Sequence, residues 1–164
     1  SDYGGSCQMW EDGSAIAFCP KSTYDYPLDT RGVIQHEAGG HGFGKLADEK
    51  IAINGFIPND EIANINSKHA LGWYQNISST GKMHKVPWAH LIFDERYSND
   101  VDIFEGGCMY SRGVFRSEQN SCMNNYIPYF NTISREAIVK RIMEYAGESY
   151  SFEEFVKNDK VEFP

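Results

Sequence analysis

The side chains best suited to chemistry are concentrated in residues 36–49, HEAGGHGFGKLADE. Imidazole and carboxylate groups are common zinc ligands, and a glutamate directly after a ligating histidine can act as a general base. His36 and His41, however, are five positions apart. On a regular α-helix, side chains with that spacing diverge by about 140°. Either the two histidines merely lie in a Gly-rich helix end, or the helix widens by one residue between them.

Two glycines occupy the place where such a widening must occur. Gly39 and Gly40 lie between the histidines, and glycine tolerates unusual backbone angles while costing about 1 kcal/mol in an ordinary helix. A π-type bulge absorbs one residue and would return both histidines to one face. We therefore predict a π-bulge at Gly39-Gly40, with His36 and His41 as metal ligands and Glu37 as the general base.

A third ligand is expected shortly after the helix. Gly44 can turn the chain sharply, and Asp48 and Glu49 follow it. Two imidazoles and one carboxylate, with the fourth position open to water, are typical of a catalytic zinc site. Because successive side chains of an extended segment alternate, Asp48 and Glu49 should point to opposite sides, so we expect one of them to be the ligand. His69 and His90 stay open as alternatives.

Composition restricts the class of protein. The 164 residues suit one domain, and 41% of them are hydrophobic, which is enough for a core. Fifteen basic against 23 acidic residues give a net charge of -8, which argues against nucleic-acid binding because phosphate contacts supply most of that affinity. No apolar run approaches the roughly 18 residues of a membrane span. The chain opens at Ser1 without a Met, so we expect a processed or excised part of a longer chain.

The elements that must position the motif are mostly helical. We expect a short strand at 14–19, a helix from about residue 30 into the motif, and helices at about 59–73 and 134–147. A short last helix should begin at the capping box SFEE, residues 151–154. Helices with few strands predict an α+β fold, helix-rich with a small sheet. The expected N-caps are Thr30, Ser134 and Ser151, and Gly147 should end the helix that Ser134 begins.

The four cysteines, Cys7, Cys19, Cys108 and Cys122, allow three pairings. A Cys108–Cys122 disulfide would be worth about 3 kcal/mol in the chain-entropy model. Four buried thiols are an equally good interpretation, so the sequence leaves the pairing open. Because no CxxC pair occurs, a cysteine-rich zinc site is disfavoured.

The motif resembles that of a known family. HEAGGHGFGKLADE is similar to the HExxGHxxGxxxDE motif of the IgA-peptidase family of zinc metallopeptidases. Further similar blocks are YGG at 3–5, VPWAHLI at 86–92, FEGGCMYSRGVFR at 104–116, SCM at 121–123 and YFNTISREAIVKRIM at 129–143. Members of that family usually carry a strand and a further N-terminal domain before YGG, and the present sequence has neither.

The resemblance implies a metzincin-like catalytic domain that hydrolyses peptide bonds through a Zn²⁺-bound water, with Glu37 as general base. In metzincins the third ligand lies three residues after the glycine of the turn, where this sequence has Ala47, which cannot ligate. The resemblance therefore favours Asp48, one residue later, as the ligand, with Glu49 as a supporting hydrogen-bond partner.

The resemblance further implies a turn containing Met123 beneath the metal, and Tyr126 as a group that stabilises the oxyanion. An extended substrate would pair with the strand at 14–19. The partner we expect is therefore a protein or peptide substrate. We expect the protein itself to be bacterial and extracytoplasmic, that is, secreted, periplasmic or at the cell surface.

Two other functions compete with hydrolysis by a peptidase. One is a non-catalytic binding module of the same fold, in which zinc is structural. A structural site is usually closed by four protein ligands and needs no glutamate beside the metal, so Glu37 favours an enzyme. The other is a zinc-dependent amidase that acts on cell-wall peptides.

Overall fold

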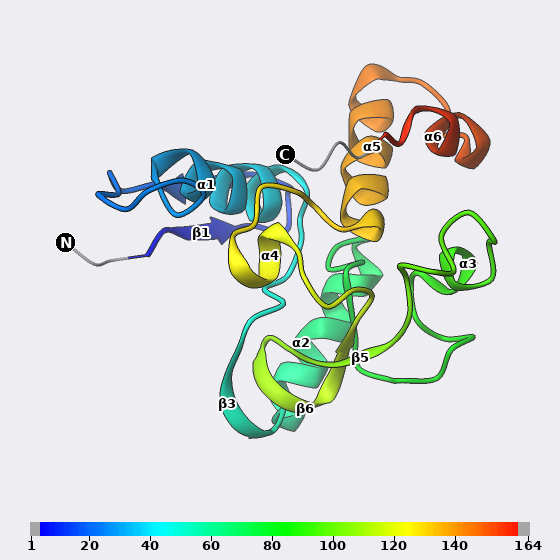
Figure 1. The fold of residues 1–164 in the computed structure, drawn as a ribbon, viewed down its shortest axis with the longest axis horizontal. Coiled ribbons are helices and arrows are strands. Elements are labelled where there is room, and N and C mark those ends of the chain that lie inside the picture. Colours follow the sequence, from blue (N-terminus) through cyan, green and yellow to red (C-terminus); the bar gives the residue numbers. More distant parts are fainter. Residues whose placement is uncertain (1–3, 161–164) are drawn as a thin grey trace.

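The N-terminal part of the molecule is a β-hairpin packed on a helix. A computed structural model describes residues 4–160 and shows a mixed α+β fold (Figure 1). Strands β1 (Ser6–Met9) and β2 (Ala15–Phe18) pair antiparallel, which confirms the strand predicted at 14–19. The hairpin packs on η1 (Gln35–Phe43), which continues α1 (Thr30–Ile34). No helix in the described part is long and apolar enough to cross a membrane.

A second sheet is built around one long strand. Strand β6 (Met109–Arg116) pairs in parallel with β3 (Ile51–Phe56) and antiparallel with β4 (Ile77–Ser78) and β5 (Phe104–Gly107). Helix α2 (Asn59–Ala70) follows β3, close to the range predicted for the second helix. Its Ile65 is buried in a cluster with Ala47, Ile57, Ile77 and Val114. This cluster fixes α2 and the sheet next to the segment that carries Asp48.

The largest hydrophobic cluster lies under the C-terminal helices. Helices α3 (Ala89–Ile92), α5 (Thr132–Ala146) and α6 (Phe152–Asn158) all contribute to it. Trp88 is fully buried there, and its indole Nε1 donates to the Asp102 carbonyl at 2.9 Å. In Figure 1, α5 and α6 lie together at the end of the molecule opposite β3.

Two of the predicted N-caps are one to three residues too late. The Asp29 side chain caps α1 by accepting from the N–H groups of Arg31 and Gly32, so Thr30 is the first helical residue. Asn131 caps α5 by accepting from the Ser134 N–H. Asp and Asn are strong caps because a short side-chain oxygen reaches these free donors. The Ser151 cap of α6 is confirmed, and so is Gly147 (φ 70°) at the end of α5.

All four cysteines lie in the described part of the chain and are free thiols. Burial raises the pKa of both Cys108 and Cys122 to about 12. The interpretation as four thiols therefore fits the structure, and the Cys108–Cys122 disulfide does not.

Candidate metal centre

The motif adopts a π-helix. Helix α1 passes without a break into η1, whose nine residues include both histidines. At its end the Gly44 N–H donates to the Gly39 carbonyl, five residues back, at 2.8 Å. The predicted widening is confirmed, but it extends over the whole motif helix and is not restricted to Gly39-Gly40. Because a π-helix places residues five apart nearly above one another, the rings of His36 and His41 lie 4.8 Å apart between centroids.

Gly40 allows a distant turn to approach this helix. Helix α4 (Cys122–Asn125) lies against η1, and its Met123 is fully buried. A β-carbon at position 40 would overlap Met123 Sδ, whereas one at position 39 would make ordinary contact with Phe130. The absence of a side chain at Gly40 is therefore required for Met123 of α4 to pack this closely against η1.

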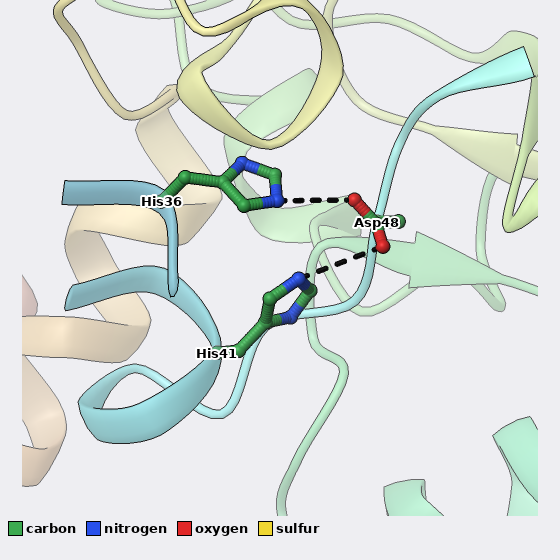
Figure 2. Close-up of side chains that lie close together, drawn as sticks. All are labelled: His36, His41 and Asp48. Atoms are coloured by element: carbon green, nitrogen blue, oxygen red, sulfur yellow. Dashed lines mark ion pairs between the residues drawn. The ribbon is translucent and has the colours of Figure 1, made fainter. Parts of the chain in front are cut away.

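Both histidines are oriented by backbone carbonyls. His36 Nδ1 lies 2.9 Å from the carbonyl oxygen of Cys122, and His41 Nδ1 lies 2.7 Å from that of Leu46. Because a carbonyl can only accept, Nδ1 is the donor in each ring, and Nε2 of each neutral ring keeps a free lone pair. Figure 2 shows both Nε2 atoms directed at Asp48, which lies on the segment that leads into β3.

The Asp48 carboxylate completes a three-ligand arrangement. Its Oδ1 lies 3.2 Å from His36 Nε2, and its Oδ2 lies 3.5 Å from His41 Nε2. Ligands at the corners of a tetrahedron around zinc, with bonds of about 2.0–2.1 Å, are about 3.3–3.4 Å apart. Among the described residues, these three form the group that could hold a metal ion, with ligand atoms all within 4.8 Å of one another. The three side chains are therefore close enough for one metal ion to bind them all.

The electrostatics of Asp48 also suit a cation. Burial opposes its ionisation, but the contacts with His36 and His41 outweigh burial, and the pKa of Asp48 is well below its usual range. Burial likewise lowers the pKa of His41, but Asp48 outweighs this and the net change is upward. Oδ1 of Asp48 is buried. Although His36 Nε2 lies 3.2 Å away, Oδ1 accepts no hydrogen bond from any described residue. A buried anionic oxygen is costly unless a cation lies beside it; Lys50 Nζ, 3.7 Å from Oδ1, offsets part of this cost, and a metal ion bound by the three side chains would offset more.

Glu49 points away from the histidines, as the alternation of side chains predicts. Its carboxylate is completely buried and accepts from Asn76 Nδ2 at 2.8 Å, Asn131 Nδ2 at 2.9 Å and Ser121 Oγ at 2.6 Å. Its backbone N–H donates to the Met123 carbonyl at 2.8 Å. Burial raises the pKa of Glu49 to about 7, although the three donors act in the opposite direction. Glu49 thus connects the Asp48 segment to the Met123 turn.

The other histidines lie elsewhere. His69 Nε2 contacts the carbonyl oxygens of Tyr74 and Ile77, both at 3.1 Å. His90 Nε2 lies 2.9 Å from Glu136 Oε2, on α5. Of the candidates left open by the sequence, Asp48 is therefore the one that the fold brings to His36 and His41.

Glu37 lines the same cleft, of about 600 Å³, as His36, His41 and Asp48. It is 3% exposed, and its carboxylate makes no hydrogen bond or ion pair with any described residue. Gly5 lies directly against it, and a β-carbon at position 5 would overlap Glu37 Cγ. The Gly at position 5 thus leaves room for this carboxylate; Tyr3 of the YGG block lies outside the described residues.

Tyr126 lies beside the histidines and pairs with a residue that the sequence analysis missed. Its ring centroid is 4.5 Å from that of His36, and its hydroxyl accepts from Lys50 Nζ at 2.7 Å. Lys50 Nζ also lies 3.7 Å from Asp48 Oδ1. The alternation that separates Glu49 from Asp48 returns Lys50 to the Asp48 side. That alternation was the available signal for Lys50.

Strand β1 borders this cleft together with β3 and β6, whereas β2, the strand for which substrate pairing is expected, does not border it. Gly5, Ser6, Cys7 and Met9 line the cleft, and no residue of β2 does. Ala15 and Ala17 of β2 line a separate hollow beside Phe43 and Arg141. The order of the two strands across η1 is set by tertiary packing, so the strand pattern alone could not reveal it.

Comparison with known proteins adds no identification to this geometry. No family model matches the sequence, and no curated protein matches it. The resemblance of the motif to the IgA-peptidase family thus stays a prediction, and the convergent ligand atoms carry the functional argument.

Proposed function

We propose that the protein is a zinc-dependent peptidase whose metal is held by His36, His41 and Asp48. The observation that carries this proposal is the convergence of two imidazole Nε2 atoms and one carboxylate in a cleft that Glu37 also lines. This donor set leaves one tetrahedral position for water or substrate, as catalytic zinc sites do. A structural site would instead be expected to contain a fourth protein ligand.

The donor set fits zinc better than calcium or magnesium. Imidazole nitrogen suits zinc, whereas calcium and magnesium prefer oxygen ligands. The carbonyls that bind His36 Nδ1 and His41 Nδ1 hold each Nε2 ready to ligate. Zinc, when bound, supplies Lewis acidity that polarises a carbonyl and lowers the pKa of water.

Glu37 is the group that would move the proton. It follows His36 directly on η1, and its carboxylate is not bound to any described residue. A buried carboxylate that no described residue binds can accept a proton from the attacking water and return it to the leaving amine. Because Gly5 has no side chain, it leaves room for this carboxylate in the cleft that the proposed ligands line.

Tyr126 and Lys50 would stabilise the charge that develops on the carbonyl oxygen. The Lys50 ammonium donates to the Tyr126 hydroxyl, which leaves the hydroxyl proton free to donate into the cleft. A preorganised donor of this kind is worth most where negative charge develops in the transition state. Strand β1 offers unpaired backbone groups along the cleft, to which an extended peptide could add as a further strand.

Peptide cleavage tests this function. The zinc-loaded chain is incubated with a mixed peptide library, and the products are identified by mass spectrometry. We expect cleavage at internal peptide bonds, which a chelator should abolish and added zinc should restore. Glu37→Gln should reduce the cleavage rate by at least about 100-fold, while the variant still binds zinc.

A cell-wall glycopeptide is offered in parallel; release of its peptide with a free amino terminus, without internal cleavage of the library peptides, would instead support the amidase. A chain that binds zinc and peptides but cleaves neither class of substrate would be a binding module.

A further inference from the structure

One carboxylate in the cleft takes no part in the metal site. Glu61 lies on the first turn of α2 and lines the same cleft as His36 and Asp48. It makes no hydrogen bond or ion pair with any described residue. The cation of this cleft, Lys50, is already bound to Tyr126 and lies close to Asp48. Away from the metal ligands, the charge offered to a substrate is therefore negative.

An apolar wall lies in the cleft with this carboxylate. In the parallel pairing of β3 with β6, Ile53 is opposite Tyr110, and Met109 precedes Tyr110 on β6. All three line the cleft, and Ile53 and Met109 are 47% and 41% exposed. Apolar side chains left this open beside a cleft are available to cover the apolar part of a ligand.

Glu61 lies on the face of α2 that borders this cleft. Asn64 and Ile65, three and four residues further along α2, line the cleft as well, and residues with that spacing share one face of a helix. Tyr74 and Cys108 line the cleft too. Asp60, its neighbour on the same first turn, does not line the cleft.

A carboxylate near an apolar wall matches one kind of side chain. Lysine and arginine have an aliphatic stem that can cover apolar side chains and a charged group that can reach a carboxylate beside them. We propose that Glu61 is a specificity-determining residue that pairs with a lysine or arginine side chain of the substrate, while Ile53 and Met109 contact its stem. This inference rests on the proposed peptidase function, because it concerns the peptide bound in the same cleft.

Binding to a non-cleaving variant tests the inference apart from catalysis. Zinc-loaded Glu37→Gln protein is titrated with fluorescent, N-acetylated peptides that differ at one position, which is lysine, norleucine or glutamate. We expect the lysine peptide to bind about tenfold more tightly than the glutamate peptide, with norleucine between them. Adding Glu61→Gln should remove the difference between lysine and norleucine, and adding Glu61→Arg should reverse the order of lysine and glutamate.

Asp60→Asn is the matched control. It removes a carboxylate from the same first turn, so it reproduces any effect on the helix without changing the cleft. Equal binding of the three peptides, no binding of any of them, or an equal loss in Asp60→Asn would overturn the role of Glu61. Charge-selective binding without cleavage by the wild-type chain would refute the peptidase and leave the Glu61 site standing. Cleavage without charge preference would refute the role of Glu61 alone.

Discussion

Gly5 lies directly against the side chain of Glu37, so a β-carbon at position 5 would overlap Glu37 Cγ. Gly5→Ala should therefore displace the carboxylate from the metal ligands. We expect peptide cleavage to fall by at least about tenfold while zinc binding is retained, because the lost function is proton transfer. Gly4→Ala is the control, since nothing lies within 4 Å of a β-carbon there. Equal activity of Gly5→Ala and wild type, at equal zinc content, would refute this positioning role.

Asp48 and Glu49 should differ in their effects on zinc. Asp48→Ala removes a proposed ligand and should weaken zinc binding more than about 100-fold, whereas Glu49→Ala should weaken it by about 10–100-fold. Glu49→Ala should also lower the free energy of unfolding by about 1–3 kcal/mol, because three buried donors lose their acceptor. Competition with a zinc chelator and urea denaturation measure the two effects. The reverse order of zinc affinities would mean that the ligand assignment is wrong.

Tyr126→Phe removes the hydroxyl that accepts the hydrogen bond from Lys50 Nζ and leaves the ring beside His36. We expect kcat to fall by about 100-fold, with zinc affinity and KM little changed, because the hydroxyl is needed in the transition state. Tyr145→Phe, at an exposed position on α5, is the control. A rise in KM alone would indicate that Tyr126 serves substrate binding.

Glu136 should make stability depend on pH in acid. Burial alone would raise its pKa, but contacts from His90, Lys140 and Tyr150 outweigh burial and lower the pKa to about 2. Since the folded value lies below the ordinary 4.5, this contribution is complete above about pH 4.5 and is lost as the pH falls to about 2. Thermal unfolding of Glu136→Gln should show a smaller loss of stability across that range than wild type. Glu144→Gln, exposed on the same helix, should keep the wild-type pH dependence.

The local features of the site were predictable because their causes are local. The five-residue spacing of His36 and His41 and the two glycines between them lie in one short segment, and together they predict a π-type helix. The same holds for Asp48 and Glu49, which an alternating segment must point to opposite sides. The α+β class likewise followed from helix and strand patterns.

The features that the sequence did not reveal depend on distant contacts. The π-helix runs over nine residues, and one side of it packs on Met123, a residue far along the chain. Lys50 reaches Tyr126 across 76 positions. The placing of β1 in preference to β2 along the cleft depends on how the hairpin packs on η1. The alternation of residues 48–50 indicates on which side Lys50 lies, but no periodic signal in the sequence indicates which distant residue each of these groups contacts.

An anomalous-scattering map recorded at the zinc edge, on crystals of the zinc-loaded protein, tests the central claim most directly. We predict one peak per chain, bonded to Nε2 of His36 and Nε2 of His41 at about 2.0–2.1 Å and to the Asp48 carboxylate at about 2.0–2.2 Å. The fourth position should hold no protein atom. No peak at this cleft, or a peak closed by a fourth protein ligand, would contradict a catalytic zinc centre in this protein.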